Sequence, residues 1–204
     1  MKLPTNDYLK CSHLADSAKC QSAIKDFSVP YPETGKGLEL YLKNSAIDEE
    51  RERLMRTYLV WHKPQSCIVG YFSLKAGLVS FNETISETEV IFDTLPGVEL
   101  ANFAVNKTFV EANRGNGLGK LLFLDFIAPI ILRQSEALGI YMLYLFALPY
   151  KKLISTYESY GFRRLSASDE KKLHRRLKPV YDKSCIFMYL PLSQLERLVD
   201  SKKI

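Results

Sequence analysis

The spacing of apolar residues changes its period several times along the 204-residue chain. Apolar residues at every third or fourth position predict helices, whereas short segments rich in β-branched and aromatic residues predict strands. Strands and helices alternate through the C-terminal half, which predicts an α/β or α+β fold with a mixed sheet. The predicted helices are 17–27, 38–53, 117–137, 150–160, 168–177 and 192–199. The predicted strands are 8–13, 56–62, 67–74, 98–105, 141–147, 162–165 and 185–190.

Turn residues separate these segments at several places. Residues 63–66 join two of the strands into a hairpin, and residues 29–37 (VPYPETGKG) predict a turn-rich connection. Residues 95–97 (LPG) predict a turn before strand 98–105, while the polar residues 80 to 97 give no clear assignment. Pro129 lies inside the predicted helix 117–137, where it removes a hydrogen bond and predicts a kink.

The composition is that of an ordinary globular protein, with 47% hydrophobic and 25% charged residues. No repeat or long linker interrupts the chain, so residues 1–204 are expected to form a single domain. The first thirty residues contain no apolar segment typical of a signal peptide. The longest apolar run, 121–132, contains Asp125 and Pro129 and is too short for a bilayer. We therefore expect a cytoplasmic protein without a membrane partner.

The four cysteines give no metal or disulfide motif. Cys11, Cys20, Cys67 and Cys185 show no C-x-x-C spacing, so neither a zinc ribbon nor a disulfide framework is indicated. His13 adds a third possible ligand beside the first two cysteines, but no fourth follows at a zinc-like spacing. Free thiols and no metal are expected.

The positive charge is concentrated in one window. The chain has 28 Lys and Arg against 23 Asp and Glu, a formal net charge of +5. Residues 151–178 contain nine basic and three acidic residues, so this window carries +6 and the remainder −1. Such a run is typical either of a solvated helix face or of a surface for a polyanion such as RNA, and both interpretations stay open.

The stretch 113–122 (NRGNGLGKLL) places three glycines before an apolar segment, which predicts a phosphate-binding loop at the start of a helix. Aligned on its Gly-Lys pair, it has Arg114 where a Walker A loop needs its first glycine and Leu121 where it needs Ser or Thr. In either register of the dinucleotide fingerprint, Lys120 or Leu122 replaces the third glycine. Both nucleotide-binding interpretations are therefore disfavoured.

The pattern R-x-x-G-x-G at 114–119 resembles the acetyl-CoA pyrophosphate loop of the GNAT superfamily of N-acetyltransferases. This resemblance implies a mixed, mostly antiparallel sheet of about seven strands, splayed between strands 4 and 5 and covered by helices on both faces. It implies acetyl-CoA as co-substrate, with no metal, and dimers are usual in the family. The loop residues that would bind the pyrophosphate are Arg114, Gly115, Asn116, Gly117, Leu118, Gly119 and Lys120.

The resemblance also suggests roles outside the loop. Phe103, Ala104 and Val105 match the end of the fourth strand, whose backbone pairs with the pantetheine arm, and the Phe103 amide is the expected oxyanion donor. Tyr157 matches the tyrosine that protonates the departing thiolate, and Glu99 matches a general base. Each has a plainer alternative: Tyr157 as a packing residue, and Glu99 as a solvated one beside the predicted turn.

The acceptor is less clearly indicated. The general interpretation is direct transfer of the acetyl group to a primary amine of a small-molecule or macromolecular acceptor. Segments 56–60, 68–77 and 99–105 also resemble the toxin-type GNAT enzymes of toxin–antitoxin modules, which acetylate aminoacyl-tRNA. A third alternative is a catalytically silent CoA-binding module. The loop from Val105 to Arg114 spans nine positions, longer than is usual in the family.

Overall fold

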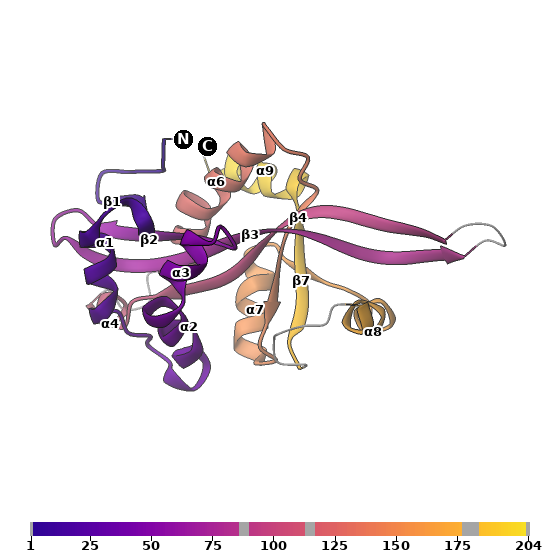
Figure 1. Cartoon of the computed structure of the whole chain (residues 1–204), viewed down its shortest axis with the longest axis horizontal. Coiled ribbons are helices and arrows are strands. Elements are labelled where there is room, and N and C mark those ends of the chain that lie inside the picture. Colours follow the sequence, from indigo (N-terminus) through magenta and orange to yellow (C-terminus); the bar gives the residue numbers. More distant parts are fainter. Residues whose placement is uncertain (1, 86–89, 113–116, 177–183, 203–204) are drawn as a thin grey trace. The chain divides into compact units, whose positions relative to one another are not determined.

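Seven strands form one sheet in the computed structural model, which describes residues 2–85, 90–112, 117–176 and 184–202. The strand order is β1-β2-β3-β4-β5-β7-β6. Figure 1 labels β1, β2, β3, β4 and β7 of these strands. β4 and β5 pair in parallel, whereas β1–β2, β2–β3, β5–β7 and β6–β7 pair antiparallel. The predicted mixed, mostly antiparallel sheet is confirmed. The strands are β1 (Leu9–His13), β2 (Arg56–His62), β3 (Cys67–Ile85), β4 (Val90–Val105), β5 (Met142–Ala147), β6 (Arg163–Arg164) and β7 (Ile186–Pro191).

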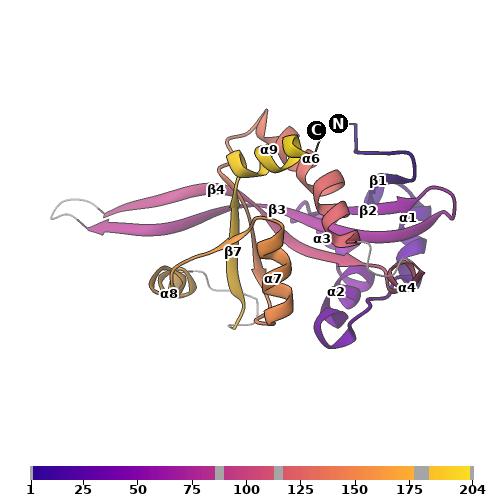
Figure 2. The same ribbon diagram turned by 180° about the vertical axis from the view of Figure 1, so that it is seen from behind.

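The helices follow most of the predicted segments, and Figure 2 shows them from the opposite side. Two short 3-10 turns, Leu14–Asp16 and Ile24–Asp26, flank the first helix. The α-helices are α1 (Ala18–Ala23), α2 (Pro32–Asn44), α3 (Ala46–Arg51), α4 (Lys107–Ala112), α5 (Leu118–Leu122), α6 (Ala128–Ser135), α7 (Lys151–Ser159), α8 (Ala167–Arg176) and α9 (Leu192–Ser201).

The contacts divide the chain into two compact units. The N-terminal unit combines Met1–Lys75 with Leu100–Ile131, and the C-terminal unit combines Ala76–Glu99 with Leu132–Ile204. Strands β3 and β4 each contribute residues to both units. Whether residues 1–204 behave as a single domain in solution stays a prediction.

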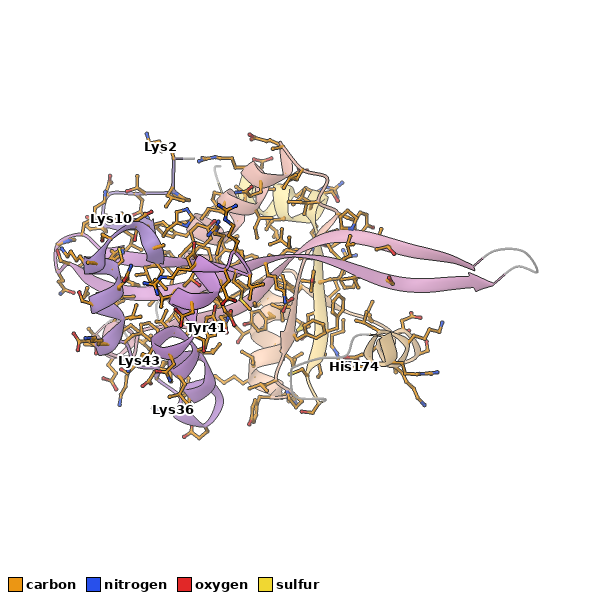
Figure 3. The ribbon with its side chains drawn as sticks, viewed as in Figure 1. Lys2, Lys10, Lys36, Tyr41, Lys43 and His174 are labelled. Atoms are coloured by element: carbon orange, nitrogen blue, oxygen red, sulfur yellow. The ribbon has the colours of Figure 1, made fainter. Side chains whose placement is uncertain are left out.

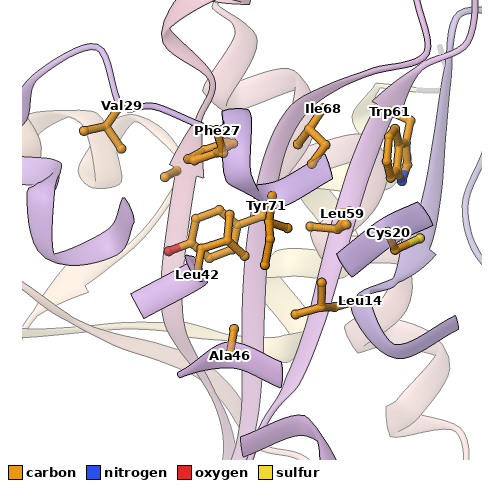
Figure 4. Close-up of a cluster of buried hydrophobic side chains, with 12 residues drawn as sticks. Leu14, Cys20, Phe27, Val29, Leu42, Ala46, Leu59, Trp61, Ile68 and Tyr71 are labelled. Atoms are coloured by element: carbon orange, nitrogen blue, oxygen red, sulfur yellow. The ribbon is translucent and has the colours of Figure 1, made fainter. Parts of the chain in front are cut away.

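The core of the N-terminal unit lies between strands and the first three helices. Leu42 and Ala46, from α2 and α3, and Leu59 and Tyr71, from β2 and β3, are all fully buried. Figure 4 shows these side chains gathered into one cluster. The Tyr71 hydroxyl donates a hydrogen bond of 2.6 Å to the Leu38 carbonyl, which satisfies the polar end of a buried ring. The apolar faces of these short amphipathic helices therefore hold them on the sheet.

The opposite face of this unit is covered by α5. Gly70 pairs with Val60 on β2 and, because side chains alternate along a strand, faces away from its neighbour Tyr71. A Cβ at Gly70 would lie 2.7 Å from Leu122 Cδ1 and 2.8 Å from the Ala104 carbonyl oxygen. Gly70 thus leaves room for Leu122, the last residue of α5, and for the Ala104 backbone near the end of β4.

The prediction for residues 29–37 was wrong in its second half. Helix α2 begins at Pro32, which suits a first helical position because proline has no N–H to leave unpaired there. Gly35 lies inside the helix, and its amide donates a 2.8 Å hydrogen bond to the Tyr31 carbonyl. The predicted helix 38–53 is instead the end of α2 followed by α3, with Ser45 between them.

The predicted turn at residues 95–97 was also wrong. These residues lie inside β4, which runs from Val90, while β3 continues to Ile85 through residues that had no assignment. The Pro96 carbonyl accepts a 2.8 Å hydrogen bond from the Tyr141 amide, and a Cβ at Gly97 would lie 3.0 Å from the Met142 carbonyl oxygen. Gly97 therefore allows β4 to pack closely against β5. Because glycine is also common in turns, the sequence alone did not indicate this role.

The predicted helix 117–137 is interrupted near its proline. A π turn over Phe123–Ile127 joins α5 to α6, and the Ala128 amide donates to the Phe123 carbonyl five residues earlier. Pro129 follows and has no amide hydrogen of its own. The helix thus departs from α geometry as a π turn directly before the proline, and the predicted kink stays a prediction.

The C-terminal unit packs helices against β5 and β7. On one face, Leu173 of α8 joins Tyr144 and Phe187, whose rings stack at 5.6 Å. Gly161 ends α7 with φ +95, the left-handed conformation predicted for this position. A Cβ there would lie 2.9 Å from Leu198 Cδ1 on α9. The predicted helices 150–160, 168–177 and 192–199 match α7, α8 and α9 within two residues at either end.

Candidate functional site

The end of β4 is fixed by an asparagine that the sequence analysis missed. Phe103, Ala104 and Val105 lie in β4, as predicted, and Asn106 follows them. The buried Asn106 side chain donates 2.9 Å to the Ile68 carbonyl and accepts 3.2 Å from the Thr108 amide. Asn106 therefore ties β4 to β3 and begins α4 like an N-cap. Asparagine directly before a helical segment was the available signal.

The long connection after Val105 contains helix α4. Residues Lys107–Ala112 are helical, so most of the described part of this connection is a helix. The Lys107 amide donates a 2.8 Å hydrogen bond to the Ser28 carbonyl, which anchors the start of α4. The sequence analysis predicted a loop here, and that prediction was wrong.

The glycine loop can be described from Gly117 onward. Gly117 has φ +59, precedes α5, and accepts a 3.0 Å hydrogen bond from the Leu121 amide. Among the described residues, no atom beyond its chain neighbours lies within 4 Å of a Cβ built on Gly117. Glycine is therefore favoured there by the backbone conformation and not by lack of space. Lys120 is exposed on the first turn of α5, whereas Leu118 and Gly119 are partly exposed. The predicted residues Arg114, Gly115 and Asn116 lie outside the described residues.

Glu99 is buried, with 5% of its surface exposed, so the alternative of a solvated side chain is wrong. It lies opposite Tyr144 in the parallel register of β4 and β5. Burial, and then the charge and hydrogen bonding of Glu99, raise the pKa of the Tyr144 hydroxyl. A Cβ at Gly77 would collide with that hydroxyl, so β3 leaves the space in which Tyr144 meets Glu99.

Tyr157 lies on α7 between two aromatic rings. Its ring centroid is 6.0 Å from that of Tyr160 and 5.7 Å from that of Phe162, both in edge-on geometry. Burial, and then the neighbouring Tyr160, raise the pKa of the Tyr157 hydroxyl. The hydroxyl therefore keeps its proton at neutral pH, and within the described part of the chain it makes no hydrogen bond. Packing and proton donation are both compatible with this position.

The structure thus groups the predicted residues by unit. Phe103, Ala104 and Val105 and the start of α5 belong to the N-terminal unit, where Gly70 contacts both Leu122 and the Ala104 backbone. Glu99 and Tyr157 belong to the C-terminal unit. Backbone amides and an exposed helix start are groups that bind phosphate, and a buried carboxylate and a protonated phenol are groups that move protons.

A polar cluster around Tyr41 was missed entirely. The Tyr41 hydroxyl contacts Met55 Sδ at 3.4 Å, and the side chain of Asn102 on β4 reaches the same sulfur at 3.9 Å. Thr57 and Ser73 hydrogen-bond to each other at 2.9 Å nearby. These residues come from separate elements, so no local motif could have indicated the cluster.

The basic window contains α8, whose charges are only partly paired. Glu170 lies 3.7 Å from Arg164 and 3.9 Å from His174, and Asp169 lies 3.5 Å from Lys172. His174 is labelled in Figure 3. Lys171 and Arg175 are exposed and have no ion-pair partner in the parts of the chain that the structure describes.

The described residues offer neither a metal site nor a membrane-spanning helix. In residues 2–85, 90–112, 117–176 and 184–202, no group of three or more His, Cys, Asp or Glu side chains is placed to hold a metal ion. None of the helices described in these ranges is long and apolar enough to cross a bilayer. All four cysteines are free thiols, with Cys20 and Cys185 buried.

Known proteins resemble the chain in structure and not in sequence. No protein-family model matches it, and no curated protein matches it. A mutant of the AtaT toxin matches with a TM-score of 0.68 and 19% identity over 96% of each chain. A mutant of KacT matches with a TM-score of 0.68 and 19% identity, covering 94% of this chain and 99% of the other. AtaT complexed with acetyl-methionyl-tRNAfMet matches with a TM-score of 0.67 and 20% identity, covering 93% and 98%.

These similarities establish the fold. The matched proteins include the toxin AtaT, and the alignments cover nearly the whole of each chain. The chain therefore has the GNAT fold, and its likeness to the toxin-type members is confirmed at the level of structure.

Proposed function

We propose that the chain is an acetyl-CoA-dependent N-acetyltransferase that transfers the acetyl group directly to a primary amine. The proposal is carried by the placement of α5 and the end of β4 at the same glycine: Leu122 and the Ala104 backbone both lie against Gly70, and Gly117 precedes α5 in the left-handed conformation. In the GNAT fold this is the position of the pyrophosphate loop. AtaTR, a matched structure at 21% identity, was solved bound with AcCoA.

The residues around α5 suit the cofactor chemically. The exposed first turn offers amide N–H groups and the positive end of a helix, both of which favour a pyrophosphate. We propose that residues 114–120 bind it, with Lys120 as a supporting cation. Backbone groups of Phe103, Ala104 and Val105 would pair with the pantetheine arm. No metal is required by this chemistry.

The proposed reaction forms one bond and breaks one. Glu99, directly or through a water, takes a proton from the acceptor amine, whose nitrogen attacks the thioester carbonyl carbon. The Phe103 amide donates a hydrogen bond to the oxyanion. The C–S bond then breaks, and Tyr157 gives its proton to the leaving thiolate, so the products are an N-acetyl amide and CoA. The raised pKa of Tyr157 supports this role, because an acid must still hold its proton at neutral pH.

Product identification tests the proposal. The purified chain would be incubated with a cell extract and isotopically labelled acetyl-CoA, and the labelled products identified by mass spectrometry. We expect label in an amide on a primary amine, together with release of CoA thiol. If the chain binds acetyl-CoA but no acceptor becomes labelled, the catalytically silent CoA-binding module is the better interpretation.

A second candidate acceptor is aminoacyl-tRNA. Two observations favour it: Lys171 and Arg175 are exposed on α8 without an ion-pair partner among the described residues, and one matched structure is AtaT complexed with acetyl-methionyl-tRNAfMet. Exposed cations of this kind attract phosphate backbones. The chain would then act as a toxin. Expression should arrest growth, and normal growth of cells producing the active protein would contradict this candidate.

The remaining expectations concern the whole molecule. On the resemblance to the family, we propose a cytoplasmic homodimer in which residues 1–204 fold as a single domain. Sedimentation velocity tests the homodimer, since a dimer has twice the mass of the 23.4 kDa chain. A single cooperative unfolding transition that is the same for two spectroscopic probes would support the single domain.

A further inference from the structure

The polar cluster in the N-terminal unit is built from side chains of several elements. We name it the Tyr41 cluster, and Figure 3 shows Tyr41 among the neighbouring side chains. Tyr41 comes from α2, Glu49 from α3, Thr57 from β2, Ser73 from β3, Asn102 from β4 and Met55 from the residues before β2. Thr57 and Ser73 are fully buried, whereas the other members are partly exposed. The cluster therefore has a buried polar floor and a side that solutes can reach.

The hydroxyl groups of the cluster converge on Tyr41. Thr57 Oγ1 and Ser73 Oγ lie 2.9 Å apart across β2 and β3. Burial raises the pKa of the Tyr41 hydroxyl and hydrogen bonding with Ser73 and Thr57 lowers it. The charge of Glu49 and a hydrogen bond with its side chain raise it. A fully buried hydroxyl pair beside a tyrosine is costly unless its hydrogen-bonding capacity is used.

The Tyr41 hydroxyl and the Asn102 side-chain amide both contact a weak hydrogen-bond acceptor. The Tyr41 hydroxyl donates to Met55 Sδ at 3.4 Å, and Asn102 Nδ2 approaches the same sulfur at 3.9 Å. A thioether is a weak acceptor compared with a carboxylate or a carbonyl. Stronger polar groups from a bound molecule could replace these contacts at little cost.

Two consecutive glutamates show a contrast. Both oxygens of Glu50 are satisfied: Oε1 by Arg56 at 2.7 Å, and Oε2 by the Thr57 amide at 2.6 Å. Oε2 of Glu49, by comparison, is buried and has no hydrogen-bond partner among the described residues. Glu50 holds α3 to β2, whereas Glu49, whose side chain also interacts with Tyr41, retains Oε2 as an unused acceptor among the described residues. A buried carboxylate oxygen without a donor is destabilising, so its retention suggests a ligand that supplies the donor.

We infer that the Tyr41 cluster binds the protonated amino group of the acceptor before transfer, with Glu49 as the residue that recognises its charge. A primary ammonium carries three donors, which match a carboxylate oxygen and neighbouring hydroxyls. A divalent metal would need several oxygen or nitrogen ligands, and a single carboxylate with neutral hydroxyls suits it poorly. Asn102 directly precedes Phe103, so an amine held here lies beside the residue expected to hold the oxyanion. This inference rests on the proposed acetyltransferase function.

Ligand-detected NMR can test the inference without turnover. The probes are a panel of L-amino acid amides, each compared with its N-acetylated form, added to the full chain. The test variant is Glu49→Gln, which keeps the shape of the side chain and removes its charge. The control is Asp48→Asn on the same helix, since Asp48 is exposed and pairs only on the surface with Arg51 at 3.2 Å. Acetyl-CoA affinity and the melting temperature are measured for each protein.

We expect wild-type protein and Asp48→Asn to bind free amides and to reject the N-acetylated forms. Glu49→Gln should bind the amides roughly tenfold or more weakly, because a charge-assisted hydrogen bond is lost. Its acetyl-CoA affinity should not change, and its melting temperature should be equal or higher, because a buried unpaired charge is removed. Equal amide binding by wild type and Glu49→Gln would overturn the inference. So would a failure of the wild type to bind any amide, or a marked loss of stability in the variant.

Turnover separates this inference from the proposed function. If wild type acetylates an acceptor and Glu49→Gln leaves the KM for that acceptor unchanged, the function stands and the role of Glu49 fails. If amide binding depends on Glu49 but no acceptor is acetylated, the cluster stands as an amine site and the proposed function fails.

Discussion

The buried Glu99 carboxylate lies opposite Tyr144 in the parallel register of β4 and β5, and both residues are 5% exposed. Gly77 on β3 leaves room for the Tyr144 hydroxyl. The three residues therefore form one arrangement in the C-terminal unit, in which a buried acid is held next to a phenol.

This arrangement predicts an interaction between two substitutions. Gly77→Ala should destabilise the protein by about 1–3 kcal/mol, because the new methyl group collides with the Tyr144 hydroxyl. Tyr144→Phe removes that hydroxyl, so Gly77→Ala should cost less in the Tyr144→Phe background. Chemical denaturation of the four proteins measures both costs. Equal costs in the two backgrounds would mean that Gly77 and Tyr144 do not approach as described.

Gly117 predicts a conformational effect on the cofactor loop. Gly117→Ala introduces no collision, but a non-glycine residue at φ +59 should cost about 1 kcal/mol and weaken acetyl-CoA binding. Gly139→Ala is the matched control, because Gly139 also has open space around it and does not have a positive φ. Calorimetry with acetyl-CoA compares the two. An equal loss of affinity in both variants would argue against the assigned position of the pyrophosphate.

The buried tyrosines predict a limit to stability at high pH. Burial raises the pKa of Tyr58 and of Tyr160 from 10.0 to about 12. A raised folded-state pKa means that the unfolded chain releases these protons first, so their contribution is complete below pH 10 and is lost as pH rises toward 12. Denaturant titrations at several alkaline pH values should show this decline. Tyr58→Phe should lessen it, whereas Tyr8→Phe, at an exposed position, should not.

The tRNA alternative predicts a specific salt dependence. Replacing both Lys171 and Arg175 with alanine should weaken tRNA binding and reduce the slope of log affinity against log salt by roughly 1 to 2. The control replaces Lys36 and Lys43 with alanine, which removes the same amount of positive charge. Unlike the residues on α8, these two lysines are paired with Glu39, at 3.1 and 3.0 Å. Filter binding at several salt concentrations provides the slopes. Identical slopes for the two double variants would remove α8 from the tRNA interface.

Local patterns predicted much of the fold but not its longer-range features. The hairpin of β2 and β3, strand β5 and the left-handed Gly161 were all evident from apolar periodicity and turn chemistry. Pro96 and Gly97 misled the analysis, because their place in β4 depends on contacts with Tyr141 and Met142 on a distant segment. Pro32 misled it in the opposite sense, as a proline that begins a helix also resembles a turn.

In the candidate site too, local features could be predicted from the sequence, whereas features that depend on distant contacts could not. A left-handed glycine before a helix can be recognised from the loop 113–122, as Gly117 demonstrates. The burial of Glu99 could not be predicted, because it follows from pairing with Tyr144 across the sheet. The Tyr41 cluster is assembled from two helices and three strands, so only the folded chain brings its members together.

Thiol release by Tyr157→Phe is the most direct test of the proposed acetyltransferase. The variant keeps the ring that packs against Tyr160 and Phe162 and removes only the proton that would go to the thiolate. With an acceptor identified by labelling, we predict a fall in kcat of about 10²-fold or more, with acetyl-CoA affinity and stability close to wild type. Tyr150→Phe, at an exposed position before α7, should keep full activity. Wild-type turnover in Tyr157→Phe would contradict the account.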